Sequence, residues 1–170
     1  LPMHMPRTIA LSVLVLTGIA VAAAQRQESE KPEIAGDPYT VALDVSESNG
    51  QTTWKYTINK AGPASKDLGH FVVDFGNCGD ESPTIGSIVS VTVNGEDWSD
   101  RIESSEGGGT GCNIASGNIV KFDKLPKAAT HVIEFTLDDI YPPMESSGWL
   151  KSGQMCVRTA LLAPGCKGYR

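Results

Sequence analysis

The chain has little positive charge: 14 lysine and arginine residues stand against 20 aspartate and glutamate residues, giving a net charge of −6 over 170 residues. A protein that binds nucleic acid needs a basic surface to neutralise phosphates, and electrostatic docking on an anionic membrane has the same requirement. The composition therefore predicts no nucleic-acid partner and no such docking. Taken alone, the acidic balance indicates only a protein that stays soluble.

Histidine is also scarce, and the motifs of common enzymes are missing. Only His70 and His131 follow the N-terminal apolar segment, and no G-x-S-x-G sequence is present. A nucleophilic triad needs serine or cysteine, histidine and a carboxylate within reach of one another. The sequence therefore predicts a protein that is not an enzyme and has no catalytic residue. The alternative is a hydrolase that uses one of the two histidines.

Three further patterns that could suggest chemistry are better explained by turns. The glycine-rich loop at 106–111 lacks the helix and lysine of a phosphate-binding loop. The acidic turn at 79–82 lacks the repeat that is typical of calcium-binding loops. Two carboxylate pairs lie at strand ends, where acidic side chains are usually solvated. These pairs are Asp97 with Asp100 and Asp138 with Asp139. We predict no metal and no cofactor.

Apolar runs long enough to span a membrane are missing as well. One run of 16 residues, 9–24, follows Arg7 and ends in small residues, whereas a membrane-spanning helix needs about 20 residues. A short basic region, an apolar region and an A-x-A end are typical of a secretory signal peptide. We predict a signal peptide over 1–24, a flexible polar lead over 25–38 and a secreted protein without a membrane span in the mature chain.

Four cysteines remain after the apolar run, and no two of them have the close spacing of a zinc site. An even number of cysteines in an exported protein indicates two disulfides. Three pairings are possible, and the spacing does not choose among them. The four residues are Cys78, Cys112, Cys156 and Cys166.

The clearest positive signal is the alternation of apolar and polar residues, which is typical of half-buried strands. Residues 39–46 and 52–58 alternate in this way, and Asn49-Gly50 between them is the sequence of a two-residue hairpin turn. A second Asn-Gly at 94–95 predicts another hairpin. In the strand before it, Val89 is expected to point inward together with Ile85, Val91 and Val93.

Further strands are predicted over 70–75, 118–123, 131–137, 149–153 and 155–162, with a loop over 141–148. About eight short strands, with a range of seven to nine, and no helical periodicity after residue 24 are typical of a β-sandwich. We predict an all-β fold: one antiparallel sandwich over 39–170, cross-linked by disulfides.

The three tryptophans are the candidates for ligand binding, because aromatic faces on a sandwich can stack on sugars. Trp54 shares the parity of its inward-facing neighbours and is assigned to the core. Trp98 lies near a hairpin and Trp149 borders a loop, so these two are the speculative ligand-binding residues. The favoured interpretation is nevertheless that all three belong to the core.

Several segments together resemble a loosely defined group of secreted, cell-surface β-sandwich proteins of poorly known role. The group pattern is W-x-Y, then S-H-W with an apolar strand and a cysteine, then I-K-F-D, then G-P-x-C. Here the matching segments are "TTWKYTI", "LGHFVVDFGNC", "NIVKFD" and "LLAPGC". The chain departs from it at Gly69, Phe71, Val120 and the reversed Pro164-Gly165. The resemblance covers about residues 52–166 and implies a sandwich fold and an extracellular location. It favours a Cys78–Cys166 bond, which leaves Cys112 to pair with Cys156.

From these features we predict a non-enzymatic extracellular module, structural or adhesive, at or near the cell surface. One alternative is a sandwich that binds carbohydrate or another ligand. Another is a filament subunit that assembles when the polar lead or residues 39–45 add to the sheet edge of a neighbour. The corresponding partners are other surface proteins, a second copy of the chain, or polysaccharide.

Overall fold

The computed structural model describes residues 38–62, 66–105, 110–115 and 117–168. The predicted signal peptide and nearly all of the polar lead lie outside these residues, as does most of the glycine-rich loop. No helix among the described residues has the length and apolarity needed to cross a membrane.

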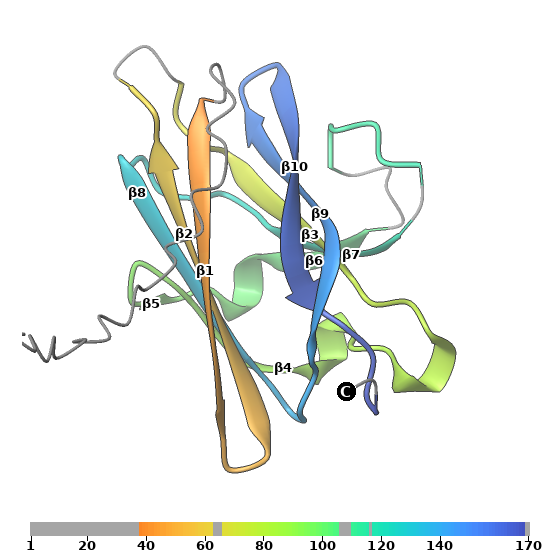
Figure 1. The fold of residues 1–170 in the computed structure, drawn as a ribbon. Coiled ribbons are helices and arrows are strands. Elements are labelled where there is room, and N and C mark those ends of the chain that lie inside the picture. Colours follow the sequence, from red (N-terminus) through yellow and green to blue (C-terminus); the bar gives the residue numbers. More distant parts are fainter. Residues whose placement is uncertain (1–37, 63–65, 106–109, 116, 169–170) are drawn as a thin grey trace, which may run out of the picture. The chain divides into compact units, whose positions relative to one another are not determined.

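Two antiparallel five-stranded sheets pack against each other, which confirms the predicted β-sandwich (Figure 1). The first sheet has the order β1-β2-β8-β4-β5 and the second the order β10-β9-β3-β7-β6. The strands of the first sheet are β1 (Tyr39–Ser48), β2 (Gln51–Lys60), β8 (Thr130–Leu137), β4 (Ile88–Val93) and β5 (Glu96–Asp97). Those of the second are β10 (Met155–Pro164), β9 (Pro143–Ser152), β3 (His70–Phe75), β7 (Asn118–Phe122) and β6 (Ile102–Ser105).

The first hairpin forms as the sequence predicts. Strands β1 and β2 pair without a break from Tyr39 opposite Lys60 to Ser48 opposite Gln51. The turn residues Asn49 and Gly50 have φ angles of 53° and 75°, the left-handed values that a two-residue hairpin turn requires. The second Asn-Gly, at Asn94, also adopts positive φ angles and joins β4 to β5.

The core between the sheets is built from aromatic rings. Phe135 of β8 lies 5.7 Å from Phe75 and 5.4 Å from Phe122 of the second sheet, measured between ring centroids. Tyr56 of β2 contacts Phe71 of β3 edge to face at 5.3 Å. Aromatic pairs in these arrangements contribute about 0.5–1.5 kcal/mol beyond the area that they bury.

Two predictions about individual segments are wrong. Val89 is 53% exposed, because a β-bulge between Ile88 and Ser90 adds one residue to β4 and shifts the alternation. Residues 143–148, predicted as loop, form the first part of β9 and pair with β10. Pro143 is the first residue of that strand, a position where proline costs no ladder hydrogen bond.

The two sides of the sandwich differ. On one side, the chain leaves β5, passes through the 3-10 turn η3 (Ser99–Arg101) and enters β6 of the opposite sheet. The Arg101 guanidinium covers the Trp98 ring at 4.1 Å. We call this the closed side. Figure 1 looks onto the other side, which is bordered by β1 and β10 and which we call the open side.

Candidate functional site

Both disulfides involve the edge strand β10 or the residues that follow it. Cys112 bonds to Cys156, the second residue of β10, and Cys78 bonds to Cys166, which follows the end of the strand. The presence of two disulfides agrees with the sequence prediction, which left three pairings open; the pairing observed is the one that the resemblance favoured. The strand is therefore fixed covalently near each end to segments that are distant in sequence.

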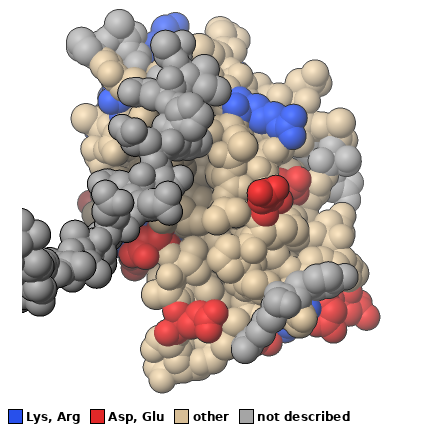
Figure 2. Space-filling model, viewed as in Figure 1, with Lys and Arg blue, Asp and Glu red and all other residues tan. Residues whose placement is uncertain are grey.

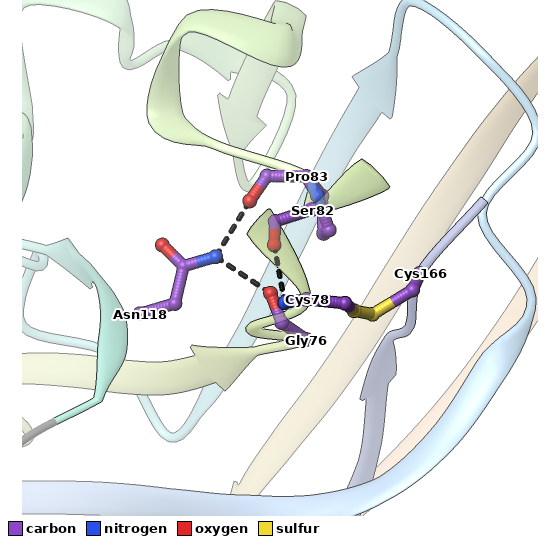
Figure 3. Close-up of a disulfide and its surroundings, with 6 residues drawn as sticks. All are labelled: Gly76, Cys78, Ser82, Pro83, Asn118 and Cys166. Atoms are coloured by element: carbon purple, nitrogen blue, oxygen red, sulfur yellow. Dashed lines mark hydrogen bonds between the residues drawn. A yellow bond between two sulfur atoms is a disulfide. The ribbon is translucent and has the colours of Figure 1, made fainter. Parts of the chain in front are cut away.

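The Cys78–Cys166 bond is embedded in a network of hydrogen bonds (Figure 3). The Asn118 side-chain amide donates to the carbonyls of Gly76 at 2.8 Å and Pro83 at 2.6 Å. The Cys78 N–H donates to Ser82 Oγ at 2.6 Å. A Cβ atom at Gly76 would lie 3.0 Å from Cys166 Sγ, so glycine is needed there for the close approach of the chains. Sequence reasoning missed Asn118, because its partners are brought to it only by folding.

The Cys112–Cys156 bond holds a loop over the outer face of the second sheet. Ile114 of this loop forms a small buried cluster with Val72 of β3 and Ile119 of β7, outside the main core. Cys112 and Trp149 pack against the cluster. For this reason Val72 is buried although its neighbours Phe71 and Val73 face the main core.

Charged side chains surround the same loop. The Lys121 ammonium lies 3.3 Å from Glu103 Oε2 and 3.3 Å from Asp123 Oδ1. Asp123 Oδ1 also lies 3.7 Å from His70 Nδ1, and His70 Nε2 hydrogen-bonds to the carbonyl oxygen of Thr110. Lys121 lies in β7 and Asp123 is the residue that follows the strand; both belong to the K-F-D sequence. Because they are two residues apart in an extended segment, their side chains point to the same face. That spacing was the signal in the sequence for this cluster.

The two candidate catalytic histidines lie on strands of different sheets, and both contact backbone. Burial lowers the pKa of the His70 imidazole below its usual value, although its contact with the Thr110 carbonyl opposes the shift. His131 is buried, and its Nε2 lies 2.7 Å from the Pro126 carbonyl oxygen. Each imidazole therefore commits one nitrogen to a backbone carbonyl.

The carboxylate pairs do not form two-carboxylate sites. Asp139 Oδ2 contacts Lys167 Nζ at 2.9 Å, and Asp138 Oδ1 accepts from the Tyr141 hydroxyl at 3.4 Å. Asp97 accepts from Ser99. Within the described parts of the chain, no three histidine, cysteine, aspartate or glutamate side chains group in a way that could hold a metal ion.

The tryptophans divide in a way that the sequence did not predict. Trp98 is only 3% exposed, and its Nε1 donates to the Asp123 carbonyl at 2.8 Å. Trp98 therefore belongs to the core, as the favoured interpretation has it, and its speculative assignment to ligand binding is wrong because its indole fills the closed side. Trp54 is in the core, as predicted. Trp149 is partly exposed on the outer face of β9, and the Arg158 guanidinium lies 5.9 Å from its ring centroid.

No protein family matches the sequence, and no curated protein does. Among solved structures, the chain is similar to BslA, a bacterial hydrophobin, at 8% identity and a TM-score of 0.39 over 75% of this chain and 98% of that one. It is also similar to a GH20 exo-β-N-acetylglucosaminidase from Vibrio harveyi in complex with N-acetylglucosamine, at 12% identity and a TM-score of 0.38. That match covers 76% of this chain and 19% of the other. Likenesses this distant do not bear on function, which must be argued from the residues of the chain itself.

We expect the loop disulfide to hold Trp149 in place. Replacing Cys112 and Cys156 together by serine should lower the free energy of unfolding by up to about 4 kcal/mol in the chain-entropy model, for a separation of 44 residues. The fluorescence of Trp149 should shift to longer wavelength, since the loop that packs beside it is released. Urea unfolding and emission spectra measure both effects. A Cys78→Ser, Cys166→Ser variant is the control: its folded form should keep the wild-type emission. Unchanged emission in the first variant would contradict the role given to the loop.

The partly buried imidazole of His70 should make the free energy of unfolding depend on pH. The pKa of His70 is lower in the folded state, so the unfolded chain binds more protons between the two pKa values. The contribution of His70 is therefore fully present above the unfolded pKa of about 6.5 and is lost as the pH falls toward the folded pKa. We expect His70→Gln to flatten the stability curve below that pH, measured as urea midpoints from pH 7.5 to 5. If the urea midpoints of the two proteins change equally with pH, the protonation of His70 is not coupled to unfolding.

Proposed function

We propose that the protein is a non-enzymatic extracellular module, structural or adhesive, at or near the cell surface. One observation carries the proposal: both disulfides fix the edge strand β10, at Cys156 near its start and at Cys166 just after its end. An edge strand has a neighbour on one side only and is the strand most easily peeled from a sheet. Two covalent bonds near its ends oppose that peeling.

The same bonds support an extracellular location. Disulfides persist in oxidising compartments and are rare where thiols are kept reduced. The apolar segment at 9–24 adds to this, because it has the form of a secretory signal peptide. The weak resemblance to secreted cell-surface sandwich proteins is consistent with both points.

The hydrogen bonds of the two histidines to backbone carbonyls support the non-enzymatic part of the proposal. A general base needs a free nitrogen within reach of its substrate. His131 is buried, and His70 contacts both Asp123 and the Thr110 carbonyl. Their contacts are those of residues that hold strands and loops together.

Surface retention tests this proposal directly. An antibody against the folded domain should label intact, unpermeabilised cells that produce the protein, and the label should survive His70→Ala and His131→Ala if the variants fold. The Cys78→Ser, Cys166→Ser variant should lose most of the label, because β10 is no longer fixed at its end. Recovery of the wild-type chain only inside the cell would refute the proposal. A hydrolase would instead lose product release with one of the histidine variants.

A second candidate function is carbohydrate binding at Trp149. Its partly exposed ring lies beside Arg158, which donates two hydrogen bonds to Ser147 Oγ, at 3.1 Å and 2.8 Å. A ring with a polar group at its border is the kind of surface on which sugars stack. Trp98 no longer supports this function, since it is buried.

Titration with soluble polysaccharides distinguishes this candidate. Tryptophan fluorescence should change on binding, and the change should disappear with Trp149→Ala. The control is Trp98→Phe, which removes a buried indole and should leave the titration intact. A polysaccharide response that persists without Trp149 would exclude the ring as the binding surface.

A further inference from the structure

Among the described residues, the two strands on the open side each have a neighbouring strand along one edge only. Strands β1 and β10 are each ten residues long, and each is the last strand of its sheet. Their registers with β2 and β9 run without a bulge, and the only proline in either strand is Pro164, the last residue of β10. Natural proteins usually protect such edges with bulges, prolines or inward-pointing charges. Neither strand uses these devices along its length.

The backbone groups on these edges can be assigned residue by residue. In an antiparallel pair, alternate residues point their N–H and C=O groups toward the partner strand and away from it. The Ala61 N–H donates to the Pro38 carbonyl, so the even-numbered residues of β1 bond to β2. The odd-numbered residues Val41, Leu43 and Val45 therefore direct their N–H and C=O groups to the free edge.

The free edge of β10 consists of its even-numbered residues. The Leu162 carbonyl accepts a hydrogen bond of 2.7 Å from the Tyr56 hydroxyl of the opposite sheet, so it points away from β9. By the same alternation, Arg158 and Ala160 direct their N–H groups outward. Both edges thus offer main-chain donors to a further strand.

A row of apolar side chains lies between the two edges. Val41, Leu43 and Val45 of β1 and Leu161 of β10 pack against the core but are only partly buried. Met155, at the start of β10, has the same parity as Leu161 and is 43% exposed. The sandwich is therefore incompletely sealed on this side.

The two edge strands run in the same direction. At the start of β1, the Tyr39 hydroxyl donates to the Lys66 carbonyl, and Ser152, just before β10, donates to the adjacent Asp67 carbonyl. Further along, Tyr56, which pairs with Leu43, reaches Leu162 near the end of β10. Figure 1 shows both strands running downward along the open side.

Charge separates the two edges. The charged residues of β1 are Asp44 and Glu47, and the one charged residue of β10 is Arg158. Figure 2 shows acidic side chains over the lower part of the β1–β2 hairpin, and on the side of the β9–β10 hairpin a basic group with an acidic group below it. Pairing β1 with β1, or β10 with β10, would bring like charges together, whereas pairing β1 with β10 brings opposite charges together.

We propose that two copies of the chain join through their open sides to form a closed dimer. In this dimer, β1 of each copy pairs in parallel with β10 of the other. The two copies are related by a two-fold axis parallel to the strands, which leaves the strand direction unchanged. The same rotation therefore places each β1 beside the β10 of the other copy. Each sheet of one copy then continues into a sheet of the other. In a parallel pair, the core-facing residues of β1 and β10 lie on the same face. Val41, Leu43 and Val45 then lie beside Leu161 of the second copy, and Asp44 lies on the same face as its Arg158.

The inference deepens the proposed structural role and rests on it, because it names the partner of that module as a second copy. It also refines the filament alternative. Since both edges lie on one side, pairing them consumes both, and the assembly closes at two chains.

A charge exchange tests the dimer on the full chain recovered from an exporting host. Wild type should sediment as a dimer, and Asp44→Lys or Arg158→Glu alone should each weaken self-association by about threefold, because like charges then lie on the same face of both β1–β10 pairs. An equimolar mixture of the two variants should restore a dimer with one chain of each kind, identified by native mass spectrometry. The control is Asp100→Lys, an equal charge change on the closed side, which should leave the dimer intact.

A backbone variant tests the edge itself. Ala160→Pro removes one outward-directed N–H and no bond to β9, so the fold should persist by near-ultraviolet circular dichroism while the dimer weakens. Ala160→Val keeps the N–H and should dimerise like wild type.

Three results would overturn the inference. The first is a wild-type chain that stays monomeric at all concentrations, and the second is a polymer in place of a dimer. The third is a dimer whose affinity is unchanged by the charge and proline substitutions but which is lost when residues 25–37 are deleted. The last would identify the lead of the neighbouring copy as the added strand. A monomer that still labels the cell surface would refute only the dimer. A dimer absent from the surface would refute only the proposed function.

Discussion

The contact of Phe135 with the aromatic rings of the opposite sheet is the constraint on which the rest of the structure depends. Phe135 stacks with Phe75 and Phe122 across the interface, and Tyr56 joins the same cluster. Large rings bury more apolar surface than other side chains, and their preferred packing geometries restrict how the sheets can sit. This packing decides which face of each strand is inner and which is outer. Once it is fixed, the second sheet must present His70, Lys121 and Trp149 outward, and the loop held by Cys112 has a surface to cover.

The difference between the two sides of the sandwich follows from how the chain crosses between sheets. Between β5 and β6 the crossing takes only a few residues, and Trp98 fills the gap while bonding to the Asp123 carbonyl. On the side of β1 and β10, the described part of the β2–β3 connection contacts only the start of the two strands, through the carbonyls of Lys66 and Asp67. The aliphatic residues further along β1 and β10 stay partly exposed. The disulfides compensate in one respect, since they fix β10 at Cys156 and near its end. They leave the outward N–H groups of Arg158 and Ala160 without a neighbouring strand among the described residues, and the proposed roles of the protein arise from that combination of a fixed strand and an open edge.

Much of the fold could be predicted from the sequence because its strands alternate regularly. The hairpin at Asn49-Gly50 and the inward-facing Ile133, Phe135 and Leu137 of β8 are as expected. The failures occurred where a tertiary feature overrode the local pattern. A bulge displaced Val89, and pairing with β10 turned the segment after Pro143 into strand. Trp98 sits beside a turn in sequence, yet the turn folds it inward. The charged cluster around Lys121 was missed because Glu103 and His70 come from other strands.

By itself, the sequence determined the all-β class, the first hairpin and the presence of two disulfides, because alternation, turn residues and cysteine count act locally or by composition. Only the tertiary structure decided which tryptophan remains accessible, which residues surround His70 and which strand edges are left without a neighbour. Those properties depend on contacts between residues that are far apart in the chain. A periodicity of two specifies that a strand has an inner face, but it does not specify which strand will lie at the edge of the sheet.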